Sequence, residues 1–79
     1  MLSKKGRELV LFTNGAIGAT GEAAGLGAVV RRPDGEILAW VTRRMGRMTN
    51  NEAEYAALLL GLEAARRFRP QQVADAKAE

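Results

Sequence analysis

Glu54 is the acidic residue best placed for chemistry, because it lies near the start of a segment with helical spacing. Thr49 and Glu52 are three residues apart, which predicts a capping box that satisfies two backbone amides at a helix start. A carboxylate on a buried helix face needs a partner, and a metal ion bound by oxygen is one. The alternative is that Glu54 reaches solvent at the helix start, where the helix dipole favours an acid. The positions that share its face are small or apolar: Ala57, Leu58, Gly61, Leu62 and Ala65.

Composition limits the chemistry that such a site could perform. The chain has no cysteine and no histidine, which excludes thiolate–metal sites and a histidine general base. Catalysis would therefore use carboxylates, hydroxyls, lysines or a metal held by oxygen. Twelve basic and nine acidic residues give a formal net charge of +3. The basic residues are clustered, which is consistent with a polyanionic partner such as nucleic acid. The alternative is that they form ordinary solvated arginine faces.

The length of 79 residues predicts one small domain. No apolar run approaches the roughly 20 residues needed to span a bilayer, and no apolar segment typical of a signal peptide follows the first lysines. The absence of cysteine fits a reducing compartment. We therefore expect a cytoplasmic protein with no membrane association.

The elements that would position Glu54 follow the order β–β–β–α. Continuous apolar runs predict three strands, the first of them buried on both faces, and helical spacing followed by proline predicts the helix. We expect a polar tail without a strand after the helix, and therefore an α/β fold made of a three-stranded antiparallel meander and one helix. The predicted ranges are 8–14, 26–32 and 37–43 for the strands, 50–68 for the helix and 70–79 for the tail.

Turn residues separate the predicted strands. Pro33-Asp34-Gly35 predicts a tight turn, because proline presets its dihedral angle and glycine accepts a positive φ. Residues 15–25 contain four glycines and predict a flexible loop. Asn14-Gly15 would then be a turn after the first strand. Trp40 lies in the middle of an apolar run, and we expect it in the core.

Four segments of this chain resemble a known family. They are Phe12-Thr13-Asn14-Gly15-Ala16, Gly25-Leu26-Gly27-Ala28-Val29-Val30, the Pro33-Asp34-Gly35 turn, and the run from Thr49 to Leu58 that begins Thr-Asn-Asn-Glu-Ala-Glu. Together they are similar to the N-terminal half of ribonuclease H type 1 and its bacterial relatives. The resemblance covers about residues 8–69, and its most specific part is the Thr-Asn-Asn-x-x-Glu segment after three strands.

The resemblance implies a mixed five-stranded sheet and a metal-dependent nuclease that cuts the RNA strand of an RNA–DNA hybrid. In that family four carboxylates hold two divalent metals, Mg²⁺ or Mn²⁺. The family glutamate falls on Glu54, which would be a catalytic residue and metal ligand. The family's first aspartate falls on Asn14, which keeps the shape of aspartate without its charge. The resemblance also implies nucleic-acid contacts at Asn50, Asn51, Gly15 and Ala16, although asparagine at a helix start is equally a good cap.

The remaining two acids of the family lie beyond the first helix. Asp75 is in roughly the right region, but the apolar strand context around the family acid is missing. We therefore expect a truncated domain without independent nuclease activity, either a remnant that binds an RNA–DNA hybrid or a half-domain that associates with itself. The alternative is an active endonuclease, dependent on Mg²⁺ or Mn²⁺, that is assembled by oligomerisation.

Self-association is expected because the missing strands would leave the first strand at an open edge. Part of the leucine-rich helix would also be bare. A two-fold dimer joined through first strands or helix faces would cover these surfaces.

Overall fold

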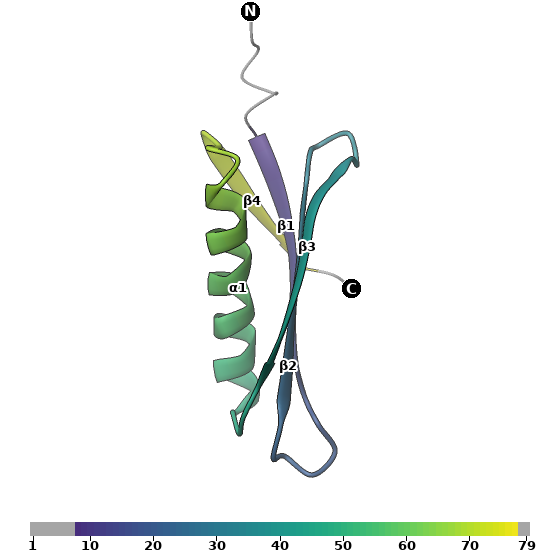
Figure 1. The fold of residues 1–79 in the computed structure, drawn as a ribbon, viewed down its shortest axis with the longest axis vertical. Coiled ribbons are helices and arrows are strands. Elements are labelled where there is room, and N and C mark those ends of the chain that lie inside the picture. The colour runs from purple at the N-terminus through teal and green to yellow at the C-terminus, as the bar shows by residue number, and fades with distance from the viewer. Residues whose placement is uncertain (1–7, 78–79) are drawn as a thin grey trace, which may run out of the picture.

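The sheet is built around β1 (Glu8–Ile17), with β2 (Ala24–Arg31) and β3 (Ile37–Met45) on one side of it and β4 (Gln72–Lys77) on the other. The computed structural model describes residues 8–77 (Figure 1). The strand order is β3-β2-β1-β4. Strands β1, β2 and β3 pair antiparallel, while β4 pairs parallel with β1. The predicted α/β class and antiparallel meander are confirmed, with one strand more than expected.

The fourth strand corrects two expectations. The tail was expected to contain no strand, but Gln72–Lys77 forms β4, and β1 therefore lies inside the sheet and not at its edge. The side-chain pattern of this segment gave little indication of a strand, because Val73 is its only larger aliphatic residue. Val73 packs against the buried cluster that contains Leu9 and Leu11, and the edge of β1 supplies the hydrogen bonds.

The turn between β2 and β3 has the predicted chemistry. The Gly35 amide donates to the Arg32 carbonyl at 2.9 Å, and the Arg32 amide donates to the Glu36 carbonyl at 2.8 Å. Gly35 has φ 102°, a conformation that other residues adopt at a cost. The Asp34 carboxylate accepts from the Glu36 amide at 2.9 Å. The predicted hairpin is therefore confirmed.

The helix α1 (Asn50–Arg66) begins at the predicted capping box. The Thr49 amide donates to Glu52 Oε1 at 2.8 Å, and the Glu52 amide donates to Thr49 Oγ1 at 3.1 Å. The helix ends two residues before the expected Phe68, because the chain there tightens into a turn. Arg69 adopts φ 49°, which is incompatible with continuing the helix.

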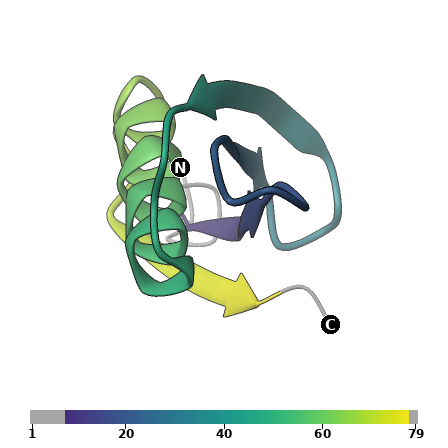
Figure 2. The same ribbon diagram turned by 90° about the horizontal axis from the view of Figure 1, so that it is seen from below.

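The core lies between α1 and one face of the sheet (Figure 2). Ala53, Ala57, Gly61 and Ala65 are buried, so small residues let the helix sit close to the strands. Leu62 was expected on this face but is 39% exposed, and the buried leucine is Leu60. The buried stripe is therefore rotated slightly from the prediction.

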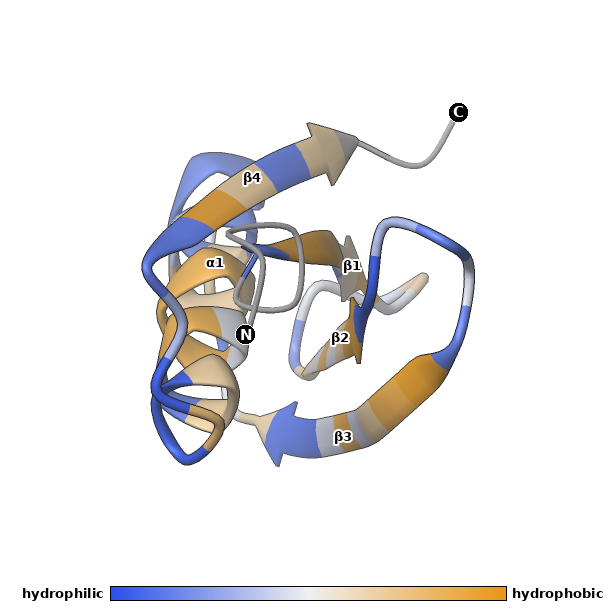
Figure 3. Cartoon of the chain, turned by 90° about the horizontal axis from the view of Figure 1, so that it is seen from above, coloured by the Kyte–Doolittle hydropathy of each residue, from blue (hydrophilic) through white to orange (hydrophobic). Residues whose placement is uncertain are grey.

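The other face of the sheet is covered by no element within residues 8–77. Trp40 lies on this face and is 74% exposed, so its expected place in the core was wrong. An apolar run such as Leu-Ala-Trp-Val suggests burial on both faces, whereas this sheet has a helix on one face only. The strand β3 also changes from mostly hydrophobic in its first half to hydrophilic in its second half, before the hydrophobic Met45 that ends it (Figure 3).

Candidate functional site

The end of β1 lies directly against the start of α1, and a glycine makes this approach possible. A Cβ added at Gly15 would lie 2.9 Å from the Ala53 Cβ and would collide with the Ala53 carbonyl group. The expectation of a turn at Asn14-Gly15 was wrong, because β1 continues to Ile17. Because Gly15 packs directly against Ala53, the residues next to them in the sequence, Asn14 and Glu54, also lie close together.

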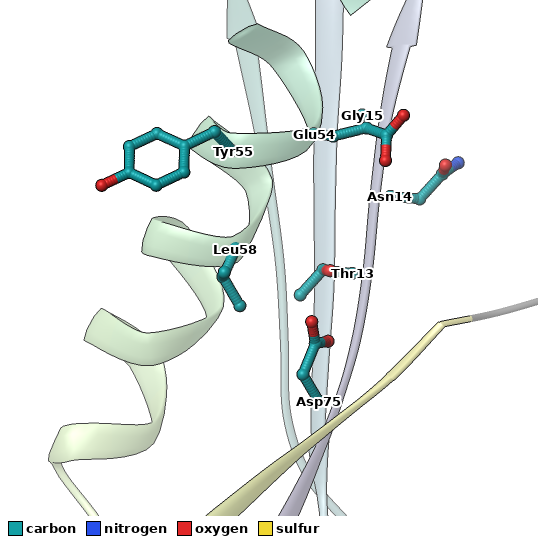
Figure 4. A pocket seen from close by; sticks show the side chains of 7 residues that line it. All are labelled: Thr13, Asn14, Gly15, Glu54, Tyr55, Leu58 and Asp75. Carbon is teal, nitrogen blue, oxygen red and sulfur yellow. The ribbon is translucent and has the colours of Figure 1, made fainter. Parts of the chain in front are cut away.

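A cavity of about 410 Å³ opens where β1, α1 and β4 meet. In Figure 4, Glu54 extends from the helix toward β1, and its carboxylate lies near Gly15 and Asn14. The Asp75 carboxylate points toward Thr13, whereas the Tyr55 ring points to the outer side of the helix. Glu54, Asn14 and Asp75 are all exposed to solvent, so a ligand could reach them. The lining residues are Thr13, Asn14, Gly15, Glu54, Tyr55, Leu58 and Asp75.

The cavity gathers some of the predicted site residues and not others. Asn14, Gly15 and Glu54 line it. Ala16 lines a different depression, at the end of β3, together with Arg43 and Arg44. Asn50 and Asn51 lie exposed in the first turn of the helix and do not line the cavity.

Thr49, not an asparagine, caps the helix. Its side chain accepts from the Glu52 amide, so the cap does not use the side chains of Asn50 and Asn51. This result weakens the interpretation in which the two asparagines serve only as caps. Both asparagines are exposed and lie about one helical turn before Glu54.

Asp75 was rejected as a site residue from the sequence, yet it lines the cavity. The reason is β4, which the sequence pattern did not reveal and which runs parallel beside β1. In the register of these strands Asp75 lies opposite Leu11, three residues before Asn14. With a rise of about 3.3 Å per residue, Asp75 and Asn14 differ in level by roughly 10 Å. Asp75 therefore lies at the far end of the cavity from Glu54.

This arrangement does not fit a pair of divalent cations. Two such ions need several anionic oxygens that converge on them. The cavity offers two separated carboxylates, and Asn14, near Glu54, contributes only a neutral amide. Within residues 8–77, no group of three or more acidic, histidine or cysteine side chains could hold a metal ion. Nor does this part of the chain contain a helix long and apolar enough to cross a membrane.

Known structures share this fold. A ribonuclease H1 from the halophilic archaeon Halobacterium salinarum is 33% identical with a TM-score of 0.82, and the match covers 91% of this chain and 55% of that one. The N-terminal ribonuclease H domain of a Mycobacterium tuberculosis protein is also 33% identical, with a TM-score of 0.81, over 91% of this chain and 52% of that one.

A third structure, LC11-RNase H1 in complex with an RNA/DNA hybrid, is 31% identical with a TM-score of 0.76. That match covers 90% of this chain and 54% of that one. The present chain thus spans about half the length of these solved relatives. No protein of curated function matched it significantly.

The family model described as "Reverse transcriptase-like" matches residues 12–74, which include the strands β2 and β3, the helix α1 and most of β1. With the sheet order and the ribonuclease H neighbours, this match identifies the chain as a member of that ribonuclease H-like family.

Proposed function

We propose that this chain binds RNA/DNA hybrids without cleaving them by itself. The observation that carries the proposal is the neutral amide of Asn14 at the point where β1 approaches Glu54. By the resemblance to ribonuclease H, this position would hold an aspartate. Without that charge, and with Asp75 displaced along β4, the residues described lack the anionic cluster that a two-metal reaction requires.

Other features support retained binding. One relative was solved with an RNA/DNA hybrid bound. Asn50 and Asn51 are exposed in the first turn of α1, shortly before Glu54 in the sequence, and are not used for capping. The net charge of +3 favours association with a polyanion. Neutral amides and arginines can contact sugars and phosphates without a metal.

The binding test uses a fluorescently labelled RNA/DNA hybrid and the 79-residue chain. We expect salt-sensitive binding, with the logarithm of the affinity falling linearly with the logarithm of salt concentration. The Asn50→Ala/Asn51→Ala double variant should bind about 30-fold more weakly, since each of the two lost hydrogen bonds is worth roughly 1 kcal/mol. The matched control is Gln71→Ala, which removes an exposed amide elsewhere and should bind normally. Failure of the wild-type chain to bind at low salt would contradict the proposal.

The cleavage test adds Mg²⁺ or Mn²⁺ to the same hybrid. We expect no cleavage by the chain, and none by Asn14→Asp, because one added carboxylate does not complete the cluster. A second candidate function, metal-dependent hybrid cleavage by an assembled oligomer, is favoured by the two carboxylates that the cavity retains, Glu54 and Asp75. Metal-dependent cleavage that disappears in Glu54→Gln would support this second candidate instead.

A further inference from the structure

The second half of β3 and the segment after it are basic, and nearby acids balance their arginines unequally. The Arg43 guanidinium lies 4.0 Å from the carboxylate of Glu63 in α1. The Arg47 guanidinium lies 3.5 Å from the carboxylate of Glu22, in the turn between β1 and β2. Arg44 is exposed and forms no ion pair with any acid that the structure describes. Its charge is therefore available to an anion that approaches from solvent.

Arg44 lies at the end of a row of very small residues. It pairs with Gly25 of β2, which pairs in turn with Ala16 of β1. The next residues along β1 and β3, Ile17 and Met45, pack against the core beneath α1. Because side chains alternate along a strand, the row lies on the opposite face of the sheet. A Cβ added at Gly25 would meet nothing within 4 Å, so a ligand can approach the backbone here.

A depression of about 430 Å³ lies at this end of the sheet. Thr42, Arg43 and Arg44 line it, and the other described residues of its lining are apolar or glycine, with no acid among them. The depression is therefore electropositive. Figure 1 shows the end of β3 and the turn between β1 and β2 at the same end of the molecule as the start of α1.

The depression adjoins the candidate site along β1. Ala16 lines the depression, and Asn14, two residues earlier, lines the cavity that contains Glu54. In the strand register Asn14 lies level with Thr42, two residues before Arg44. With about 3.3 Å per residue and 4.8 Å between strands, the Cα atoms of Asn14 and Arg44 lie roughly 12 Å apart in a flat sheet. At about 3.4 Å of rise per nucleotide, a strand of a few nucleotides spans this distance.

We propose that this depression binds a backbone phosphate of the hybrid and that Arg44 supplies the charge that holds it. The proposal rests on the function proposed above, because the same nucleic acid would occupy the cavity at Glu54. A guanidinium can donate two parallel hydrogen bonds to a phosphate. The small residues beside Arg44 let the phosphate approach without displacing a side chain. Contacts of this kind fix the register of the nucleic acid and read no sequence.

The charge is tested with Arg44→Gln and the labelled RNA/DNA hybrid. We expect binding to weaken about 5- to 10-fold, the effect of one lost hydrogen-bonded contact. The slope of log affinity against log salt should fall in magnitude by about 0.9, the contribution of one phosphate. Arg44→Lys keeps the charge and should keep the slope. The matched control is Arg66→Gln, which removes an equal charge from the last turn of α1 and should leave the slope unchanged.

The shape of the depression is tested with Gly25→Val, which leaves every charge in place. Valine suits a strand, and the space around Gly25 is open, so the fold should persist. Its methyl groups would occupy the floor between Ala16 and Arg44, and hybrid binding should weaken to a similar extent as in Arg44→Gln. Circular dichroism and urea denaturation check that each variant is folded.

A hybrid whose DNA strand carries only neutral methylphosphonate links assigns the phosphate to a strand. If Arg44→Gln still binds this hybrid more weakly than the wild type does, the phosphate belongs to the RNA strand. If the two chains bind it equally, the phosphate belongs to the DNA strand.

Two results would overturn the proposal, and they can be told apart. A wild-type chain that does not bind the ordinary hybrid contradicts both this site and the function proposed above. If the wild type binds but Arg44→Gln matches Arg66→Gln in affinity and in salt slope, the phosphate site is wrong while hybrid binding stands.

Discussion

At the scale of single residues, two glycines set how closely the helix approaches the central strand. Gly15 lies in β1 against the backbone of Ala53, and Gly61 lies in α1. A Cβ at Gly61 would lie 3.0 Å from the Thr13 side chain and 3.3 Å from that of Leu11. Glycine lowers the stability of a helix or strand in isolation. Here the cost is offset by close packing, which also brings Asn14 near Glu54.

Gly15→Ala should therefore destabilise the protein. The added methyl group has no space beside Ala53, and forcing such a group into a packed interface costs about 1–3 kcal/mol. Gly25→Ala is the matched control, because a Cβ at that position of β2 meets nothing within 4 Å. Urea denaturation followed by circular dichroism should show a lower free energy of unfolding for Gly15→Ala alone. Equal stability of the two variants would contradict the close approach.

At the scale of elements, the sequence predicted those parts of the fold that carry local signals. The capping box at Thr49 and the turn at Gly35 both depend on residue types with defined geometry. The strand β4 could not be predicted in this way, since its side chains are mostly small and do not alternate between apolar and polar as in a typical strand. It forms because β1 offers an edge and Val73 reaches the core. Asp75 was missed for the same reason, because only the strand places it beside the cavity.

Val73 is the only larger aliphatic side chain of β4 and packs against the core, so we expect it to contribute most of the side-chain packing that stabilises this strand. Val73→Ala removes two half-buried methyl groups, which should lower the free energy of unfolding by roughly 1 kcal/mol. The neighbouring Gln72→Ala changes an exposed side chain and should have little effect. Hydrogen exchange should also show faster exchange of the β4 amides in Val73→Ala. If both variants behave alike, the packing of Val73 does not hold this strand.

At the scale of the whole molecule, the sheet has one covered and one open face. Phe12, Val29 and Trp40 lie side by side across three strands on the open face. The Arg31 guanidinium lies over the Phe12 ring, 4.3 Å from its centroid, and shields part of this row. Trp40 stays exposed because nothing within residues 8–77 covers β3 there.

The single tryptophan gives a direct measurement of this open face. We expect the folded protein to emit at nearly the wavelength of an exposed indole and to be quenched efficiently by acrylamide, with little further change on unfolding in urea. A strongly blue-shifted, protected emission would contradict an exposed Trp40.

The parallel pairing of β1 with β4 also bears on the order of events during synthesis. The hairpin and the helix are made of neighbouring segments and can form as soon as they leave the ribosome. The strand β1 cannot pair with β4 until residues 72–77 have been translated, because β4 is formed by the last residues of the described chain. Pairings between such distant segments are slow to form. Until then the nascent polypeptide carries an unsatisfied backbone edge, the period in which chaperone contact or misassociation is most expected.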